Sequence, residues 1–410
     1  MKQCSPIGFD RRIRVHRLIP WKGSVRDLVE EYKVSKRVMI VAGEASGDLH
    51  GSALVREAHA IDPTLTFFGM GGPLMRRAGV DTLVDAREMA VVGLVEVAAH
   101  FPTIIRAFRK LKECLRTDPP DLLILIDYPD FNLRLAGVAR KAGVKVLYYI
   151  SPQVWAWRVG RVKKIARLVD RMAVVFPFEV PFYEKEGVPV SFVGHPLVDA
   201  VRPEMPPDEA RRSFGIDGNR RTVGLCPGSR TQEIRTHLPL IMESARVLKE
   251  RFPELQFILP LASSLSRSDI DPFLNDSGVS VIVVEGKNYD VIQVCDAVIT
   301  VSGTVTLEIA LMGVPMVIIY KVSPLTYCIG KRLIRVDHIG LCNIVANKRV
   351  VKELIQHEAV PELIAAEIGN ILADSAYAAD IRDGLKHVAE RLGGGDCSSR
   401  VAAIVMEMIA

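Results

Sequence analysis

Short apolar runs alternate with helical segments along the chain from Lys36 onward. In the first half, the apolar runs predict strands at Arg37–Ala42, Leu65–Gly69, Leu122–Ile126, Lys145–Ile150, Met172–Val175 and Val190–Val193. Nearly continuous apolar strands that alternate with helices are typical of a parallel sheet with helices on both faces. The first half therefore predicts a doubly wound α/β domain.

The same pattern begins again after Arg202–Asp208, a charged and proline-rich joint. Strands are predicted at Thr222–Cys226, Gln256–Pro260, Val279–Val284, Ala297–Val301 and Met316–Tyr320. We expect two doubly wound, Rossmann-like parallel-sheet domains that face a cleft, over residues 36–200 and 201–390, with a C-terminal helix over 391–410. Ligands of such sheets bind beyond the carboxyl ends of the strands.

Residues 1–35 fit neither half, and a loosely ordered extension is expected there, with docking on anionic lipid as the alternative. Residues 1–36 hold nine Lys or Arg against four Asp or Glu, whereas the whole chain of 410 residues carries a formal charge of +5. The remainder is therefore close to neutral, which argues against a nucleic-acid binder.

The seven cysteines are scattered, and none forms a C-x-x-C pair. This spacing argues against a disulfide framework or a structural zinc site and favours reduced thiols in the cytoplasm. The N-terminus lacks a secretory apolar region, and no stretch approaches the roughly 18 apolar residues of a membrane span. We therefore expect a cytoplasmic protein.

Two glycine turns in the second half suggest a site for a nucleotide diphosphate. Gly228, Ser229 and Arg230 follow one predicted strand, and Ser302-Gly303-Thr304 follows another and opens a helix that carries Glu308. Helix N-termini attract anions, and arginine matches phosphate oxygens. Glu308 can accept hydrogen bonds from ribose hydroxyls. A capped helix with a surface arginine, and an acid that satisfies the helix dipole, are the alternatives.

Two further clusters lie at strand ends in the first half. Asp127 ends an apolar strand, where a partly desolvated carboxylate suits a general base, although a helix cap is the alternative and Asp130 fits that role better. Glu44 and Ser46 lie in a glycine turn, Gly43–Asp48, in which Ser46 can cap the next helix. No ligand set for a metal accompanies Asp127, and no metal or other cofactor is expected.

Two other segments suggest contacts with apolar ligands. Trp155, in Ser151–Arg158, suggests the wall of a sugar or apolar site, with domain packing as the alternative. Met89–Arg116 has an apolar start and a basic tail, which suits either a membrane surface or a core-packing helix. Three isolated histidines (His195, His237 and His338) are expected to be structural.

The motifs Val41–Asp48, Ser151–Arg158, Leu225–Arg230 and Ser302–Thr304 strongly resemble the lipid-A-disaccharide synthase family. The resemblance covers about residues 36–390. It implies a GT-B fold and a metal-independent, inverting glycosyltransferase, peripheral to the cytoplasmic face of the inner membrane. The implied donor is UDP-2,3-diacylglucosamine, the acceptor is 2,3-diacylglucosamine 1-phosphate, and the products are the β-1′,6 disaccharide and UDP.

The resemblance also assigns residues. It makes Asp127 and Arg230 the essential pair and places Asn343 in the nucleotide region. It places an apolar segment against the lipid (Met89, Val91, Val92 and Leu94), and Glu44, Ser46 and Trp155 are expected on the acceptor side. It implies that C-terminal segments can be exchanged in a homodimer. Gln153 and Cys342 depart from the serine and proline expected at these positions.

The expected mechanism has Asp127 take the proton of the attacking 6-hydroxyl, while Arg230 and the amides after Gly228 stabilise the leaving diphosphate. Three alternatives stay open: a UDP-N-acetylglucosamine 2-epimerase, a sugar transferase with undecaprenyl-linked acceptors, and a non-catalytic protein that binds UDP-sugar.

Overall fold

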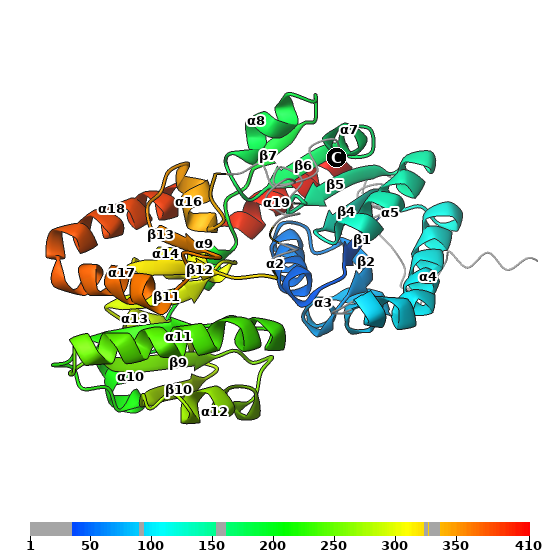
Figure 1. The fold of residues 1–410 in the computed structure, drawn as a ribbon. Coiled ribbons are helices and arrows are strands. Elements are labelled where there is room, and N and C mark those ends of the chain that lie inside the picture. The colour runs from blue at the N-terminus through cyan, green and yellow to red at the C-terminus, as the bar shows by residue number, and fades with distance from the viewer. Residues whose placement is uncertain (1–34, 90–93, 153–160, 324–326, 328–336) are drawn as a thin grey trace, which may run out of the picture.

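The computed structural model describes residues 35–89, 94–152, 161–323, 327 and 337–410 (Figure 1). Within them the chain forms two parallel sheets, of seven and six strands. Their orders are β3-β2-β1-β4-β5-β6-β7 and β10-β9-β8-β11-β12-β13. The predicted fold class of two doubly wound α/β domains is therefore confirmed.

The first sheet has two apolar faces because side chains alternate along each strand. Its strands are β1 (Arg37–Ala42), β2 (Thr66–Gly71), β3 (Val80–Asp85), β4 (Leu122–Ile126), β5 (Lys145–Tyr149), β6 (Arg171–Val174) and β7 (Val190–Phe192). On β1, Val38 and Ile40 belong to the cluster that α2 (Ala45–Ile61) covers, whereas Met39 and Val41 face α4 (Leu94–Thr117) and α5 (Pro129–Lys141). Shorter elements are α3 (Pro73–Arg77), the 3-10 turn η1 (Ala86–Glu88), α7 (Val162–Ala166), α8 (Glu179–Glu184) and α9 (Leu197–Ala200).

The second sheet repeats this architecture. Its strands are β8 (Thr222–Cys226), β9 (Gln256–Leu261), β10 (Val281–Glu285), β11 (Ala297–Val301), β12 (Met316–Tyr320) and β13 (Lys352–Ile355). The helices are α10 (Pro207–Phe214), α11 (Thr231–Arg251), α12 (Arg267–Asn275), α13 (Asn288–Gln293), α14 (Val305–Leu311), α16 (Leu341–Ala346), α17 (Pro361–Ala373) and α18 (Ser375–Arg391). Helix α11 contacts α12 and α17, and α17 also packs on β11, β12 and β13.

The last helix, α19 (Cys397–Ile409), returns to the first domain and packs against α2, β4 and β5 (Figure 1). The chain crosses between domains twice, and the crossings meet where the His195 N–H donates to the Leu392 carbonyl over 2.8 Å. The two domains are therefore joined by two adjacent segments.

Two edge strands, β3 and β13, were not predicted. Both lie at sheet edges, and their sequences, VDTLVD and KELI, mix polar with apolar residues. Neither strand therefore forms the unbroken apolar run that marks the central strands.

Candidate functional site

The predicted diphosphate residues gather in one hollow of about 430 Å³ at the carboxyl ends of β8 and β11. These strands are neighbours, while β9 and β12 extend the sheet on opposite sides, so the hollow lies at the topological switch point. Its lining includes all of the predicted residues from the two glycine turns and the following helix: Gly228, Ser229, Arg230, Ser302, Gly303, Thr304 and Glu308. Glu233, Asn288 and Tyr320, which were not predicted, also line it.

The loop after β8 is closed by a carboxylate from its own helix. Gly228 adopts a φ of +111°, and a Cβ placed there would lie 2.3 Å from Glu233 Oε2. That oxygen accepts hydrogen bonds from the N–H groups of Ser229 (2.9 Å) and Arg230 (3.2 Å). The group that approaches Gly228 in this structure is therefore Glu233, and the amides predicted to be open to an anion are already paired. Arg230 is the N-cap residue of α11, so Ser229 lies just before the helix and does not cap it.

The turn after β11 is anchored by buried groups of the same domain. Ser302 Oγ donates to the Ile339 carbonyl over 2.8 Å. The Glu353 carboxylate, 3 % exposed, accepts from the N–H groups of Ile339 and Gly340, both over 3.0 Å. The Ser302 hydroxyl is therefore committed to holding the turn, and Thr304 remains exposed at the start of α14.

Glu308 lies in the first turn of α14, half-buried in the hollow. Burial raises the pKa of its carboxyl group. Its carboxylate accepts no hydrogen bond within the part of the chain that the structure describes, so the carboxylate oxygens remain available to hydroxyl groups of a ligand.

Asn343 does not reach the hollow. It is fully buried on α16, where its Nδ2 donates to the Val351 carbonyl and to Glu353, while its Oδ1 accepts from the N–H groups of Val350 and Val351. An amide side chain has two donor positions and two acceptor lone pairs, and all are used. The prediction of a direct nucleotide contact is corrected to a structural role beneath the turn.

Asp127 lies at the switch point of the first sheet, after β4 and beside β1. It adopts a φ of +43° and Tyr128 a φ of +47°, a left-handed conformation that few residues other than glycine adopt. The Asp127 carbonyl accepts two hydrogen bonds, from Asn132 Nδ2 and from Tyr148 Oη, both 2.6 Å long. These bonds compensate part of the backbone strain, which is a feature of functional sites.

The Asp127 carboxyl group has a perturbed acidity. Burial, and next the nearby Glu44 carboxylate, raise its pKa from 3.8 to about 6, against a smaller opposing effect of the Tyr128 N–H. Burial, and next the Glu44 carboxylate, also raise the pKa of the Tyr128 hydroxyl. The three side chains therefore form one electrostatic cluster, and Asp127 is suited to take up a proton near neutral pH.

The acceptor-side predictions have mixed outcomes. Glu44, which belongs to this cluster, and Ser46 are both exposed, but Ser46 lies within α2 and is not its cap, since Glu44 is the N-cap residue. Met89 is only 2 % exposed and packs in the core, so it is not placed to contact a lipid. Val91, Val92 and Trp155 lie outside the described residues, as does the side chain of Leu94, the first residue of α4.

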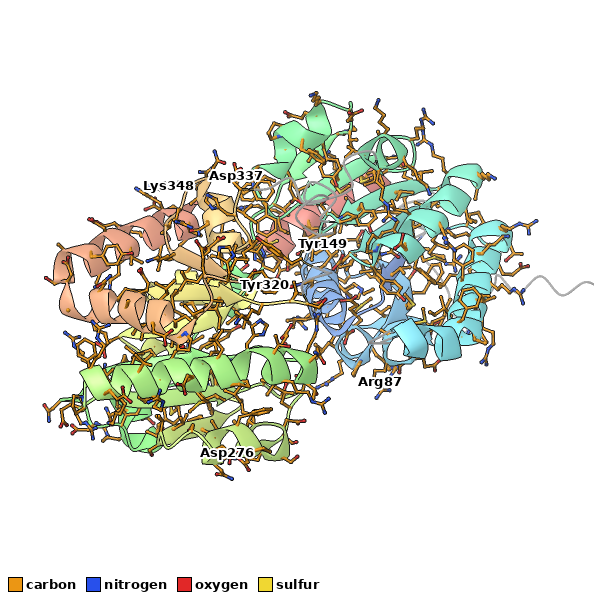
Figure 2. The ribbon with its side chains drawn as sticks, in the orientation of Figure 1. Arg87, Tyr149, Asp276, Tyr320, Asp337 and Lys348 are labelled. Atoms are coloured by element: carbon orange, nitrogen blue, oxygen red, sulfur yellow. The ribbon has the colours of Figure 1, made fainter. Side chains whose placement is uncertain are left out.

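The two site halves belong to different domains. Figure 2 shows Tyr149, at the end of β5, and Tyr320, at the end of β12, both toward the middle of the molecule. The carboxyl ends of both sheets therefore turn to the same central region (Figure 2). Among the described residues, Asp127 is not part of the lining of the Arg230 hollow.

Within the described ranges, no three His, Cys, Asp or Glu side chains gather in a way that could hold a metal ion. In the same ranges, no helix has the length and apolar character needed to cross a membrane.

Comparison with known families gives one result across nearly the whole chain. The profile of the family described as Lipid-A-disaccharide synthetase matches residues 38–406. The lipid-A-disaccharide synthase of Geobacter sulfurreducens is 70% identical over 375 residues, which cover 92% of this chain and 98% of the relative. The enzyme of the same name from Coxiella burnetii is 46% identical over 375 residues, covering 92% and 99% of the two chains.

Solved structures that resemble this fold are distant in sequence. A UDP-N-acetylglucosamine 2-epimerase from Neisseria meningitidis bound to UDP-GlcNAc has a TM-score of 0.63 at 13% identity, covering 90% of this chain and 100% of that one. A glycosyltransferase from Rickettsia africae has a TM-score of 0.58 at 14% identity, covering 92% and 99%. At such identity the likeness supports the shared GT-B fold alone.

Proposed function

The chain belongs to the lipid-A-disaccharide synthase family, and on this premise we propose that it transfers the 2,3-diacylglucosaminyl group of UDP-2,3-diacylglucosamine to 2,3-diacylglucosamine 1-phosphate. The products are the β-1′,6 lipid A disaccharide 1-phosphate and UDP. One observation carries the assignment of the site. The switch points of the two sheets hold complementary chemistry, with a proton acceptor at Asp127 and an anion-binding hollow around Arg230.

In the proposed reaction, the acceptor 6-hydroxyl attacks the anomeric carbon on the face opposite the diphosphate. The new carbon–oxygen bond forms as the bond from the anomeric carbon to the diphosphate oxygen breaks, which inverts the configuration. Asp127 receives the hydroxyl proton. The pKa of about 6 for its carboxyl group supports this role because the group is ionised at neutral pH and still basic.

The leaving diphosphate gains negative charge, and Arg230 is the proposed group that stabilises it. The Arg230 side chain is 73% exposed in the hollow and free to turn, with Nη1 3.6 Å from Glu233 Oε1. A cationic donor that turns toward the diphosphate stabilises the charge that develops in the transition state. Glu308, whose carboxylate lies in the same hollow and has no partner among the described residues, is the proposed partner of the ribose hydroxyls.

A reconstitution experiment tests this assignment. Purified protein is incubated with both diacylated substrates in detergent and EDTA, and the products are identified by mass spectrometry. We expect the disaccharide 1-phosphate and UDP, and loss of both with Asp127→Asn or Arg230→Ala. Epimerisation of UDP-N-acetylglucosamine without disaccharide would support the 2-epimerase instead, and near-normal turnover by both variants would refute the assigned site.

We also propose that the protein works at the cytoplasmic face of the inner membrane, because both substrates carry acyl chains. A groove of about 730 Å³ between α4, α5 and α7 supports this proposal. Its rim carries five exposed cationic side chains over a floor that includes Leu133 and Val138: Lys112, Arg116, Arg134, Lys141 and Lys164. None of the described lining residues is acidic, so the groove favours an anionic lipid surface.

Vesicle sedimentation tests the membrane proposal. We expect binding to vesicles of phosphatidylglycerol but not of phosphatidylcholine, weakened by salt. The double variant Arg116→Glu/Lys141→Glu should lose this binding. The pair Arg382→Glu/Lys386→Glu, on exposed positions of α18, makes the same change of charge elsewhere and should keep it. Equal loss in both pairs would contradict a specific role for the groove.

A further inference from the structure

Glu233 occupies the donors that the proposed diphosphate requires. One of its carboxylate oxygens accepts from the Ser229 and Arg230 amides, over 2.9 and 3.2 Å, and the other lies 3.6 Å from the Arg230 guanidinium. The side chain lines the hollow and is 31% exposed, so it is not locked in the core. The hollow therefore contains an anion that belongs to the protein itself.

A carboxylate and a diphosphate cannot share this position. Like charges at hydrogen-bond distance repel strongly where water is partly excluded, and each amide N–H has one hydrogen to donate. The conformation of Gly228 reinforces the competition because it brings the loop backbone against the Glu233 carboxylate, where a Cβ would collide. A ligand that uses these amides must displace the side chain.

We propose that Glu233 is a displaceable internal anion: it occupies the amides of the proposed diphosphate site, leaves them when a uridine diphosphate group binds, and competes for them again as UDP departs. This inference rests on the proposed function. Free UDP carries one more negative charge than the diphosphate diester of a UDP-sugar, so a nearby carboxylate opposes the product more than the donor. Glu233 is thus a residue that weakens product binding and promotes exchange of UDP for fresh donor.

The loop has supports that do not depend on Glu233. Ser264 Oγ donates to the Ser229 carbonyl over 2.6 Å, and α11 buries an apolar face that includes Ile234, Leu238 and Ile241. Removal of the carboxylate should therefore leave the loop and helix folded. The change in UDP affinity then reports on competition.

Calorimetric titration with UDP tests the proposal, using the full-length wild type, Glu233→Ala and Glu233→Gln at one ionic strength. We expect Glu233→Ala to bind UDP about tenfold more tightly, which corresponds to ~1.4 kcal/mol. Glu233→Gln should also bind more tightly because it keeps the size and loses the charge. Glu243→Gln is the matched control, since Glu243 is an exposed acid on the same helix that pairs with Arg246, and it should bind UDP like the wild type.

Unchanged or weaker UDP binding by the two Glu233 variants would overturn the proposal and make Glu233 a scaffold of the loop. Equal tightening by Glu243→Gln would also overturn it, because the effect would then come from net charge alone. If Glu233→Ala fails to fold, as judged by its melting temperature, the sign of the change in Glu233→Gln decides. A wild type that binds no UDP would instead refute the proposed function itself.

Discussion

At the scale of single residues, the acidity of Asp127 and the conformation of its backbone are linked. The chain turns left-handed at Asp127 directly after a fully buried strand, so the carboxyl group sits at the sheet edge with its charge partly desolvated. Two buried side chains hold that backbone through the Asp127 carbonyl. The residue is thereby fixed in place while its proton affinity is raised.

The raised pKa of Asp127 predicts the pH dependence of catalysis. A base must be ionised, and the folded-state pKa of about 6 lies above the usual 3.8, so kcat/KM should fall as pH drops through about 6. Burial is the main cause of the raised pKa of Asp127, and the Glu44 carboxylate is the second. Glu44→Gln should therefore lower this pKa and move the acid limb of kcat/KM to lower pH. A pH profile of kcat/KM checks both points, and an acid limb that stays near 6 in Glu44→Gln would contradict the coupling.

Tyr148→Phe tests the support of the Asp127 backbone. The variant removes the hydroxyl that donates to the Asp127 carbonyl, while Asn132 still donates to it. We expect kcat to fall about tenfold with little change in KM, and stability to fall by about 1 kcal/mol, the usual value of one hydrogen bond. Tyr149→Phe is the control, because it removes a buried hydroxyl of the same strand that pairs with Cys397 Sγ. Equal losses of kcat in the two variants would indicate a general effect of cavity or strain.

Site residues could be predicted where their role follows from the neighbouring sequence, and not where it depends on contacts with distant residues. Positions after strands were predictable because parallel strands present their carboxyl ends at one edge, and this placed the Arg230 and Ser302 turns in one hollow. Tyr148 reads in the sequence as one more residue of an apolar strand, and Glu233 as a first-turn acid. Their roles depend on contacts that no sequence pattern encodes.

At the scale of elements, α16 and β13 form the base on which the Ser302 turn rests. Asn343 and Glu353 pair over 2.8 Å, and Glu353 holds the backbone of the loop whose Ile339 carbonyl accepts from Ser302. The family resemblance suggested a nucleotide contact for Asn343, whereas the structure places the residue beneath the turn, where it holds Glu353 and the backbone. The same elements explain why β13 escaped prediction: its buried Glu353 interrupts the apolar run.

Asn343→Ala therefore should act mainly on stability. The substitution leaves Glu353 and two backbone N–H groups without this partner in a buried region, so we expect the free energy of unfolding to fall by about 2–4 kcal/mol. Urea titration measures it. Asn370→Ala, at an exposed position of α17, should change stability by less than about 0.5 kcal/mol. A stable Asn343→Ala variant that has lost UDP affinity would restore the direct nucleotide contact.

At the scale of the whole molecule, α19 couples the last segment of the chain to the first domain. Lys145 Nζ donates to the Met408 carbonyl over 2.7 Å, Arg171 pairs with Glu407 over 2.8 Å, and Ser399 donates to Glu57 over 2.6 Å. A C-terminal helix was expected over residues 391–410, but the sequence did not indicate the domain on which it packs. The predicted exchange of this segment in a homodimer would use the same surface and stays a prediction.

Disruption of α19 should therefore weaken the first domain, although the helix follows the second in sequence. Val405 is fully buried in the shared core, and Val405→Asp places an unpaired charge there, so we expect a loss of several kcal/mol, on the order of 3–5. Ala403→Asp, on the exposed face of the same helix, is the control and should unfold like the wild type. Thermal unfolding followed by limited proteolysis separates the domains: early cleavage within residues 37–192 of Val405→Asp supports the coupling, and early cleavage confined to residues 222–355 contradicts it. The coupling through α19 also bears on catalysis, because Asp127 belongs to the first domain and Arg230 to the second. As temperature rises, Val405→Asp should therefore lose turnover at a lower temperature than it loses UDP binding.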